Sequence, residues 1–252
     1  MKNDRKVIGI ILFISVQAIC YIAFLSFDFG NSHIDISNKL KFIMILICFC
    51  YVLFIKNTTD KDILNFMRLA SLFTVVSDLN LLLLDHYFYG VVSFVIVQQL
   101  YGLRIDAADH KNIIMRSKAK VVRTLLIRLV WQIILTMVVC SVLYIAGVNL
   151  NALLFASMIY FISIVTNVIR SLKTLMIHRQ ISNLLFALGM VLFLLCDINV
   201  GLFNLVEFIV IPGDLQHFIV TYSSILMWMF YAPSQILITV SHRCFSSEST
   251  KI

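Results

Sequence analysis

Apolar runs of membrane-spanning length dominate this chain and limit the folds open to it. Hydrophobic residues make up 61% of the 252 positions and charged residues only 13%. Soluble domains average roughly 45–50% apolar and about 25% charged residues, so a globular core of this size would not hide the excess. Only 2 Pro and 8 Gly interrupt the chain, and the segments of about ten alternating residues typical of a membrane β-barrel are missing. The sequence therefore predicts an all-α, polytopic membrane helical bundle.

We expect residues 1–252 to form a single integral membrane domain of eight spans. The candidate spans cover about 7–27, 40–55, 63–84, 87–104, 124–147, 151–169, 183–203 and 217–240. A spanning helix needs about 20 residues, so the second and fourth candidates lie near the lower limit. The first run is too long for the apolar part of a signal peptide and no small-residue cleavage site follows it, so we expect it to be retained.

The charges of the connecting segments predict the orientation of the bundle. Lys and Arg gather at the N-terminus and after the second, fourth, sixth and eighth spans, whereas connections 28–38, 85–86, 148–150 and 204–216 contain none. By the positive-inside rule, both termini are cytoplasmic. Basic residues such as Arg104, Arg128 and Arg170 are interpreted as topology signals and headgroup contacts, and no nucleic-acid partner is expected. We therefore predict a multi-pass protein of the cell membrane, with a composition compatible with a bacterial source.

Two aspartates, Asp78 and Asp197, lie inside predicted spans. A charged side chain at the bilayer centre costs roughly 2.5–3.5 kcal/mol on insertion scales, so it normally faces a protein interior and marks function. Both belong to similar segments, SDLN (77–80) and CDIN (196–199). Each lies six residues before the expected outer end of its span, which is about 9 Å at the helical rise. The pattern predicts one carboxylate pair, and it suggests two parallel four-helix halves.

Polar side chains in the fourth and eighth spans are candidate partners of the carboxylates. Gln98 and Tyr101 are three residues apart, and Tyr231 and Gln235 are four apart, so each pair shares a helix face. Pro233 removes a backbone donor from the eighth helix and frees a carbonyl upstream. These groups either orient the carboxylates and water, or only link helices through hydrogen bonds worth about 0.6 kcal/mol on average.

The other polar residues give weaker signals. Lys41 lies on the side of the carboxylates and either binds a lipid phosphate or anchors a helix end by snorkelling. The histidines lie near loops or span ends and are expected to be interfacial: His33, His110, His178, His217 and His242. Neither they nor the cysteines show metal-ligand spacing, so no metal or other cofactor is predicted. A GxSxG motif is missing, which disfavours a serine lipase.

At these residues the chain resembles the YhhN-like family of membrane proteins, which includes the lysoplasmalogenases. That family is an eight-span bundle with an aspartate in its third and seventh spans, matched here by Asp78 and Asp197. The segment Gly90-x-x-x-Phe94-x-x-x-Gln98-x-x-Tyr101 resembles the family's Gly-Phe-His-Tyr pattern, with Gln98 where the family usually has His. The segment Tyr231-x-x-x-Gln235 matches the Tyr-to-Gln motif of the family's last helix.

The resemblance implies hydrolysis of the vinyl ether of a lysoplasmalogen to a fatty aldehyde and a glycerophospho-alcohol. Asp78 and Asp197 would be the catalytic acid and base, in an order that the sequence leaves open. The implied substrate-binding residues are Gln98, Tyr101, Tyr231, Gln235 and Lys41, and the implied partners are a lysophospholipid and the membrane lipid. Two alternatives remain: a proton- or cation-coupled transporter of a small solute or lipid, and a non-catalytic lipid-binding or signalling protein. Headgroup preference and oligomeric state stay open.

Overall fold

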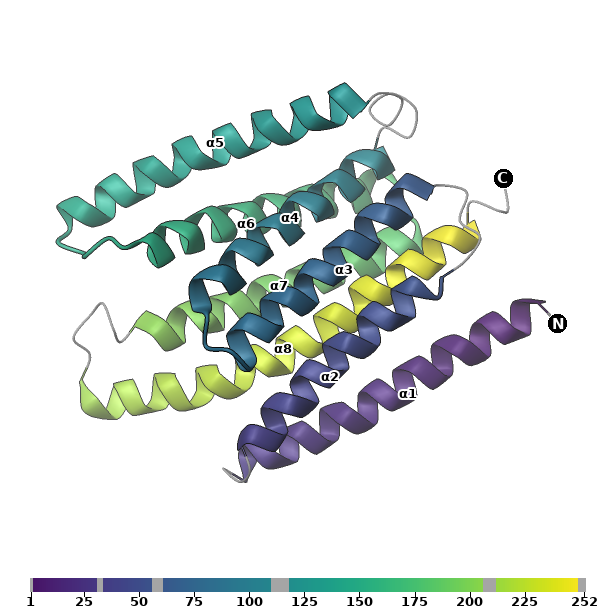
Figure 1. The fold of residues 1–252 in the computed structure, drawn as a ribbon, viewed down its shortest axis with the longest axis horizontal. Helices are drawn as coiled ribbons and strands as arrows, with labels where there is room; N and C mark the ends of the chain where they lie inside the picture. The colour runs from purple at the N-terminus through teal and green to yellow at the C-terminus, as the bar shows by residue number, and fades with distance from the viewer. Residues whose placement is uncertain (1, 31–33, 56–60, 110–117, 206–211, 249–252) are drawn as a thin grey trace.

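The computed structural model describes residues 2–30, 34–55, 61–109, 118–205 and 212–248 of the chain. Within these ranges the chain forms eight α-helices and no strand: α1 (Lys2–Phe29), α2 (Ile34–Leu53), α3 (Lys61–Leu82), α4 (Tyr87–Asp109), α5 (Lys118–Ile145), α6 (Ala152–Ile177), α7 (Ile181–Leu205) and α8 (Gly213–Glu248). The helices lie side by side as an elongated bundle (Figure 1). The prediction of an all-α bundle is confirmed.

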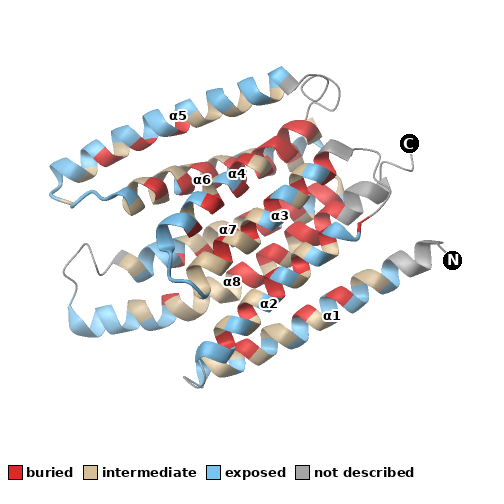
Figure 2. Ribbon diagram, viewed as in Figure 1, coloured by how far each residue is buried: buried red, intermediate tan, exposed pale blue. Residues whose placement is uncertain are grey.

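Seven of the described helices, all except α3, are long and apolar enough to cross a membrane. The α5 helix, at one edge of the bundle, carries large exposed apolar side chains such as Leu126 and Trp131, whereas buried residues concentrate on the central helices (Figure 2). The α3 helix has a lower apolar content because it contains Arg68, Asp78 and several hydroxyl and amide side chains. It packs against α2 and α4 within the bundle (Figure 1), and its role as an eighth span stays a prediction.

Two helix groups, α1–α4 and α5–α8, repeat the same packing pattern. The contact of α1 with α2 corresponds to that of α5 with α6, and α2 with α3 corresponds to α6 with α7. The close pair α3 and α4 corresponds to α7 and α8. Across the groups, α2 with α8 corresponds to α6 with α4, and α1 with α8 corresponds to α5 with α4. The packing therefore has the pattern expected of two similar halves.

Both ends of the helical chain lie at one end of the bundle. There α1 begins, and α2, α4, α6 and α8 end there (Figure 1). We call this the terminal end, and the end that holds the α3–α4 and α5–α6 connections the opposite end. The basic connections at 56–60 and 110–117 fall outside the described residues. The arrangement agrees with termini on a single side of a membrane.

The second and fourth spans, which the sequence predicted to be short, are full-length helices in the structure. Each helix extends through charged residues that lie beyond its predicted end. The α2 helix begins at Ile34 rather than at residue 40, which adds Asp35 and Lys39 to the helix, and α4 continues beyond residue 104 to Asp109. These helices contain 20 and 23 residues, close to the length that a bilayer requires. A hydropathy window stops at such charges, whereas the structure encloses Lys41, Arg104 and Asp106 in the interior.

Pro233 lies inside α8 without ending it. Its missing N–H leaves the carbonyl of Met229, four residues earlier, without the usual helical donor. The hydroxyl of Tyr21 on α1 donates to this oxygen at 3.2 Å. The helix also changes direction part-way along its length (Figure 1). The freed carbonyl expected at this proline thus connects α8 to α1.

Candidate functional site

Each of the two aspartates accepts a hydrogen bond from a tyrosine on another helix. The hydroxyl of Tyr231 on α8 donates to Asp78 on α3 at 2.6 Å. The hydroxyl of Tyr160 on α6 donates to Asp197 on α7 at 2.7 Å. Asp78 is 3% exposed, whereas Asp197 is partly exposed. Four helices therefore contribute to two Asp–Tyr pairs that differ in access.

A cluster of aromatic rings connects the two Asp–Tyr pairs. The ring of Phe94 on α4 lies 5.6 Å from that of Tyr160 and 6.2 Å from that of Tyr231. Phe193 on α7 lies 5.3 Å from Tyr231 and 5.7 Å from Phe94. Edge-to-face and tilted ring pairs at such distances are favourable and fix the orientation of each ring. The two Asp–Tyr pairs thus share one cluster of aromatic rings, and each carboxyl group is held by its own tyrosine.

The asparagines of the similar SDLN and CDIN segments make the same kind of hydrogen bond. Asn80 donates to the backbone carbonyl of Val76, and Asn199 donates to that of Leu195, each at 2.7 Å. Both asparagines therefore bond within their own helices rather than to the aspartates. Measured by sequence, Asp78 lies four residues before the end of α3 and Asp197 eight before the end of α7, where six had been expected for each.

The two glutamines proposed from the sequence lie buried with a donor unused. The side-chain nitrogen of Asn167 on α6 donates to the backbone oxygen and to the Oε1 of Gln98, at 2.7 and 3.0 Å. The Nε2 atoms of Gln98 and Gln235 have no partner, although both side chains are at most 4% exposed. Tyr101 packs edge-on against Phe186, with 5.7 Å between the rings. Of the proposed binding residues, Tyr231 is the one that is bonded directly to Asp78 or Asp197 in the described part of the chain.

Lys41 is enclosed by a carboxylate and two aromatic rings. Its Nζ lies 2.8 Å from Asp28 on α1 and within 5.6 and 5.1 Å of the ring centres of Phe24 and Trp228. The ring of Trp228 in turn lies edge-on to Tyr231 at 5.2 Å. Because Tyr231 bonds Asp78, this contact chain joins Lys41 to the candidate site.

Sequence reasoning missed Tyr160 and Asn167, which both belong to α6. A signal was present, because Tyr160, Ser163 and Asn167 follow one another at spacings of three and four residues in an otherwise apolar helix. This is the spacing of a single helix face. All three are buried, and their hydrogen bonds reach α4 and α7.

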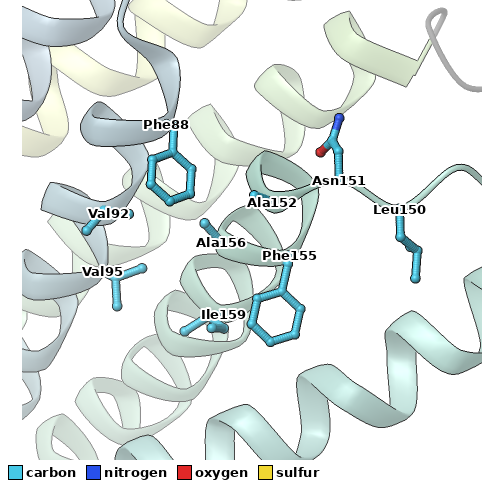
Figure 3. Close-up of a pocket in the computed structure, with 9 residues that line it drawn as sticks. All are labelled: Phe88, Val92, Val95, Leu150, Asn151, Ala152, Phe155, Ala156 and Ile159. Atoms are coloured by element: carbon cyan, nitrogen blue, oxygen red, sulfur yellow. The ribbon is translucent and has the colours of Figure 1, made fainter.

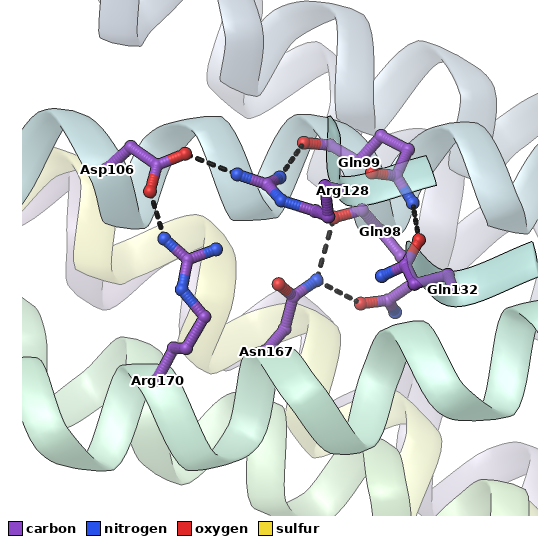
Figure 4. A network of polar contacts seen from close by, with 7 residues as sticks. All are labelled: Gln98, Gln99, Asp106, Arg128, Gln132, Asn167 and Arg170. Carbon is purple, nitrogen blue, oxygen red and sulfur yellow. Dashed lines mark hydrogen bonds and ion pairs between the residues drawn. The ribbon is translucent and has the colours of Figure 1, made fainter. Parts of the chain in front are cut away.

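A polar network joins α4, α5 and α6 beside the site (Figure 4). Asp106 on α4 forms ion pairs with Arg128 on α5 and Arg170 on α6. Arg128 also donates to the backbone oxygen of Gln99, and the side chain of Gln99 donates to Gln132 at 2.7 Å. The interpretation of these arginines as headgroup contacts is therefore wrong: internal hydrogen bonds and Asp106 satisfy them.

The structure also corrects the interfacial placement predicted for two basic residues, Arg104 and His242. Arg104 is 3% exposed and His242 fully enclosed, so neither is an interfacial group. His178 and His217 are exposed as expected. His33 and His110 lie outside the described residues. Elsewhere in the described part of the chain, no cluster of three His, Cys, Asp or Glu side chains has the geometry to hold a metal ion.

An apolar groove lies between α4 and α6 (Figure 3), and Ile159 of its lining directly precedes Tyr160 in the sequence. Its volume is about 560 Å³, in the range of small-molecule sites. The lining is apolar apart from Asn151: Phe88, Val92, Val95, Leu150, Asn151, Ala152, Phe155, Ala156 and Ile159. The Asn151 side chain caps α6 by accepting from the Leu154 N–H at 2.7 Å. A hydrocarbon chain is the chemistry that this lining suits.

Polar side chains are buried in the interior of the bundle, and large apolar side chains are exposed on its outside. This distribution identifies the class of protein. The chain is a multi-pass helical membrane protein. No family model matches it, and neither a curated protein nor a solved structure gives a match. The likeness to the YhhN-like family therefore stays a prediction that rests on the residues quoted above.

Proposed function

We propose that this protein hydrolyses the vinyl ether bond of a lysoplasmalogen, as the resemblance to the YhhN-like family implies. The observation that carries the proposal is the pair of intramembrane aspartates, each bonded to a buried tyrosine whose ring packs against Phe94 and Phe193. Purely structural helix contacts need only an amide or hydroxyl, which costs far less to bury than a carboxyl group.

The reaction needs one proton donor and one activated water. Protonation of the β-carbon of the vinyl ether gives an oxocarbenium ion, to whose positive carbon water then adds. Loss of a proton from this water leaves a hemiacetal, which breaks into a fatty aldehyde and a glycerophospho-alcohol. Two carboxyl groups in different environments provide the acid and the base.

The two burial levels suggest which aspartate has which role. Asp78 is enclosed, and a charged carboxylate is costly in such surroundings, so we assign the proton donor to Asp78. Asp197 is partly exposed, so we assign it the activation of water and the stabilisation of the cation. Tyr160 and Tyr231 hold the carboxyl groups, and the unpartnered Nε2 atoms of Gln98 and Gln235 are the donors for substrate or water.

The substrate class follows from the surroundings of the carboxylates. A single-chain lipid would place its hydrocarbon chain in the groove between α4 and α6, because that groove is apolar and its lining includes Ala156 and Ile159, which precede Tyr160 in the same helix. Its phosphate would approach Lys41, whose contacts lead through Trp228 to Tyr231. We place the terminal end in the cytoplasm of a bacterial cell and the carboxylates nearer the outer face, since basic connections favour the inside.

The direct test is aldehyde release from lysoplasmenylethanolamine by the purified chain. We expect Asp78→Asn and Asp197→Asn to lower the rate by at least about a hundredfold, the usual contribution of a general acid or base. Asp85→Asn is the matched control: Asp85 is exposed and has φ of 54°, a conformation that Asn tolerates. Thermal unfolding of each variant separates lost activity from lost folding. A wild type without aldehyde release, or full activity in both site variants, would contradict the proposal.

The repeated packing pattern favours one alternative, a transporter coupled to protons or cations. Parallel repeats related by an axis along the membrane normal are common in transporters, and paired carboxylates serve there as relay sites. This function predicts acidification inside proteoliposomes when a solute gradient is applied, with loss of the signal in Asp78→Asn. Aldehyde release by the wild type would instead support the hydrolase.

A further inference from the structure

Arg104 on α4 is a buried cation without an anionic partner. Its side chain is 3% exposed, and no described carboxylate forms an ion pair with it. Its guanidinium carbon lies 3.7 Å from the ring centre of Phe186. Its remaining contacts are long hydrogen bonds to the hydroxyls of Ser182 and Ser241, at 3.5 and 3.4 Å, and its Nε has no partner. Buried charges are normally paired, so this arrangement is incomplete.

His242 on α8 adds a second unpartnered group at the same place. It follows Ser241, it is 0% exposed, and neither of its ring nitrogens has a hydrogen-bond partner. Arg104 and Arg68 are the charged groups that act on it electrostatically. Arg68 is bonded to the backbone oxygens of Leu53 and Ile55, at 3.1 and 3.0 Å.

The groups around Arg104 add to its positive electrostatic potential instead of compensating its charge. Ser182 is the second residue of α7, so Arg104 approaches the N-terminal end of a helix, where the macrodipole repels cations. The nearest acidic residue along α4, Asp106, is occupied by Arg128 and Arg170. Arg104, the N-terminal end of α7 and an unpartnered histidine thus lie beside two hydroxyls, and within the described residues no acidic side chain is paired with Arg104.

We propose that Arg104, His242, Ser182 and Ser241 form a binding site for a phosphate group at the terminal end of the bundle. A phosphate accepts hydrogen bonds from a guanidinium in fork geometry and from hydroxyls and imidazole N–H groups at once. It would replace the long serine contacts of Arg104 and use the free Nε and the histidine nitrogens. The site is separate from the carboxylates, because Arg104 lies ten residues after Phe94, or about 15 Å along α4.

The phosphate has two sources, a lipid headgroup or a soluble phosphate. To separate them, the detergent-solubilised full chain is first exchanged extensively into phosphate-free buffer. Thermal unfolding is then followed with inorganic phosphate against chloride at equal ionic strength, and in mixed micelles of phosphatidic acid against diacylglycerol. A saturable rise in Tm with inorganic phosphate identifies a soluble ligand. A rise with phosphatidic acid alone identifies a lipid phosphate.

Variants then test the named residues. We expect Arg104→Gln to weaken the phosphate response by about tenfold or more, the effect of losing charge-assisted hydrogen bonds. Without phosphate, the same variant should unfold at a Tm no lower than that of the wild type, because it removes an unpaired buried charge. Arg123→Gln is the charge-matched control, since Arg123 is exposed on α5 and touches none of these groups.

Three outcomes overturn the proposal. One is a wild type that responds to neither phosphate source, and another is an Arg104→Gln variant that responds like the wild type. The third is an Arg104→Gln variant that still folds but unfolds without phosphate at a lower Tm than the wild type, which would make Arg104 a packing residue against Phe186. Should Arg104→Gln fail to fold, His242→Gln replaces it. That variant is expected to weaken the response, and an unchanged response would likewise reject the site.

Discussion

At the scale of single residues, the hydroxyl groups of two tyrosines hold the side chains of the two aspartates. Tyr231 and Tyr160 each donate to one carboxylate oxygen, and their rings pack in the layer of Phe94 and Phe193. A carboxyl group held at one oxygen keeps its second oxygen for substrate or water. The tyrosines are therefore positioning residues in the proposed reaction.

Replacing a tyrosine by phenylalanine tests this role without disturbing the ring packing. Tyr231→Phe and Tyr160→Phe each remove one hydrogen bond to a carboxyl group, worth about 1.5–3 kcal/mol if that group is charged. We expect aldehyde release to fall by about ten- to a hundredfold in kcat and the pH profile of kcat to shift. Tyr222→Phe, at an exposed position, is the control. Unchanged pH profiles in both site variants would assign the hydroxyls to stability alone.

The sequence predicted part of this site residue by residue. Asp78, Asp197 and Tyr231 stood out because polar groups are costly inside apolar runs. Tyr160 did not, since a tyrosine in an apolar helix is ordinary until its partner is known. Lys41 was assigned to a phosphate or an interface, and only the packing of α1 against α2 supplied Asp28 as its partner.

At the scale of helices, close backbone approach holds α7 against α8. A Cβ at Gly189 would lie 3.0 Å from the backbone oxygen of Ser234 and 3.2 Å from the backbone nitrogen of Ile238. Backbone atoms cannot move aside as a flexible side chain can. The small residue therefore allows the most extensive helix contact of the bundle, which also places Asp197 and Tyr231 on neighbouring helices.

Gly189→Ala is expected to lower the stability of the folded protein by about 1–3 kcal/mol through overpacking of this contact. Gly201 on the same helix provides a matched control, since a Cβ there meets no atom within 4 Å. Gly201→Ala should leave stability unchanged or raise it by up to about 1 kcal/mol, because alanine favours a helix more than glycine. Thermal unfolding in detergent compares the two, and equal effects would refute the close approach.

At the scale of the whole molecule, the bundle places all described helix ends at one of two faces. The terminal end holds both chain ends and the connection between α6 and α7, whereas the opposite end holds the turns near His86 and Asn149 (Figure 1). Eight spans put these two turns outside the cell. An inverted bundle, with the terminal end outside the cell, would place both turns inside instead.

Cysteine labelling of intact cells distinguishes these topologies. In a cysteine-free background, we expect a membrane-impermeant maleimide to label His86→Cys and Asn149→Cys directly, since both positions are exposed. Arg179→Cys, exposed at the terminal end, should react only after permeabilisation. The reverse pattern at all three positions would show that the positive-inside prediction fails here.

Apolar content and helix length alone determined that this chain is a multi-pass helical bundle, because bilayer thickness and backbone hydrogen bonding leave few other solutions. The same reasoning located the two costly aspartates. Tertiary structure decided everything that depends on partners from distant segments. It bonded Asp78 to Tyr231 across 153 positions, enclosed Lys41 with Asp28, and paired Asp106 with two arginines that sequence reasoning had assigned to headgroups. Charge in a sequence has a cost, but only packing shows which group compensates it.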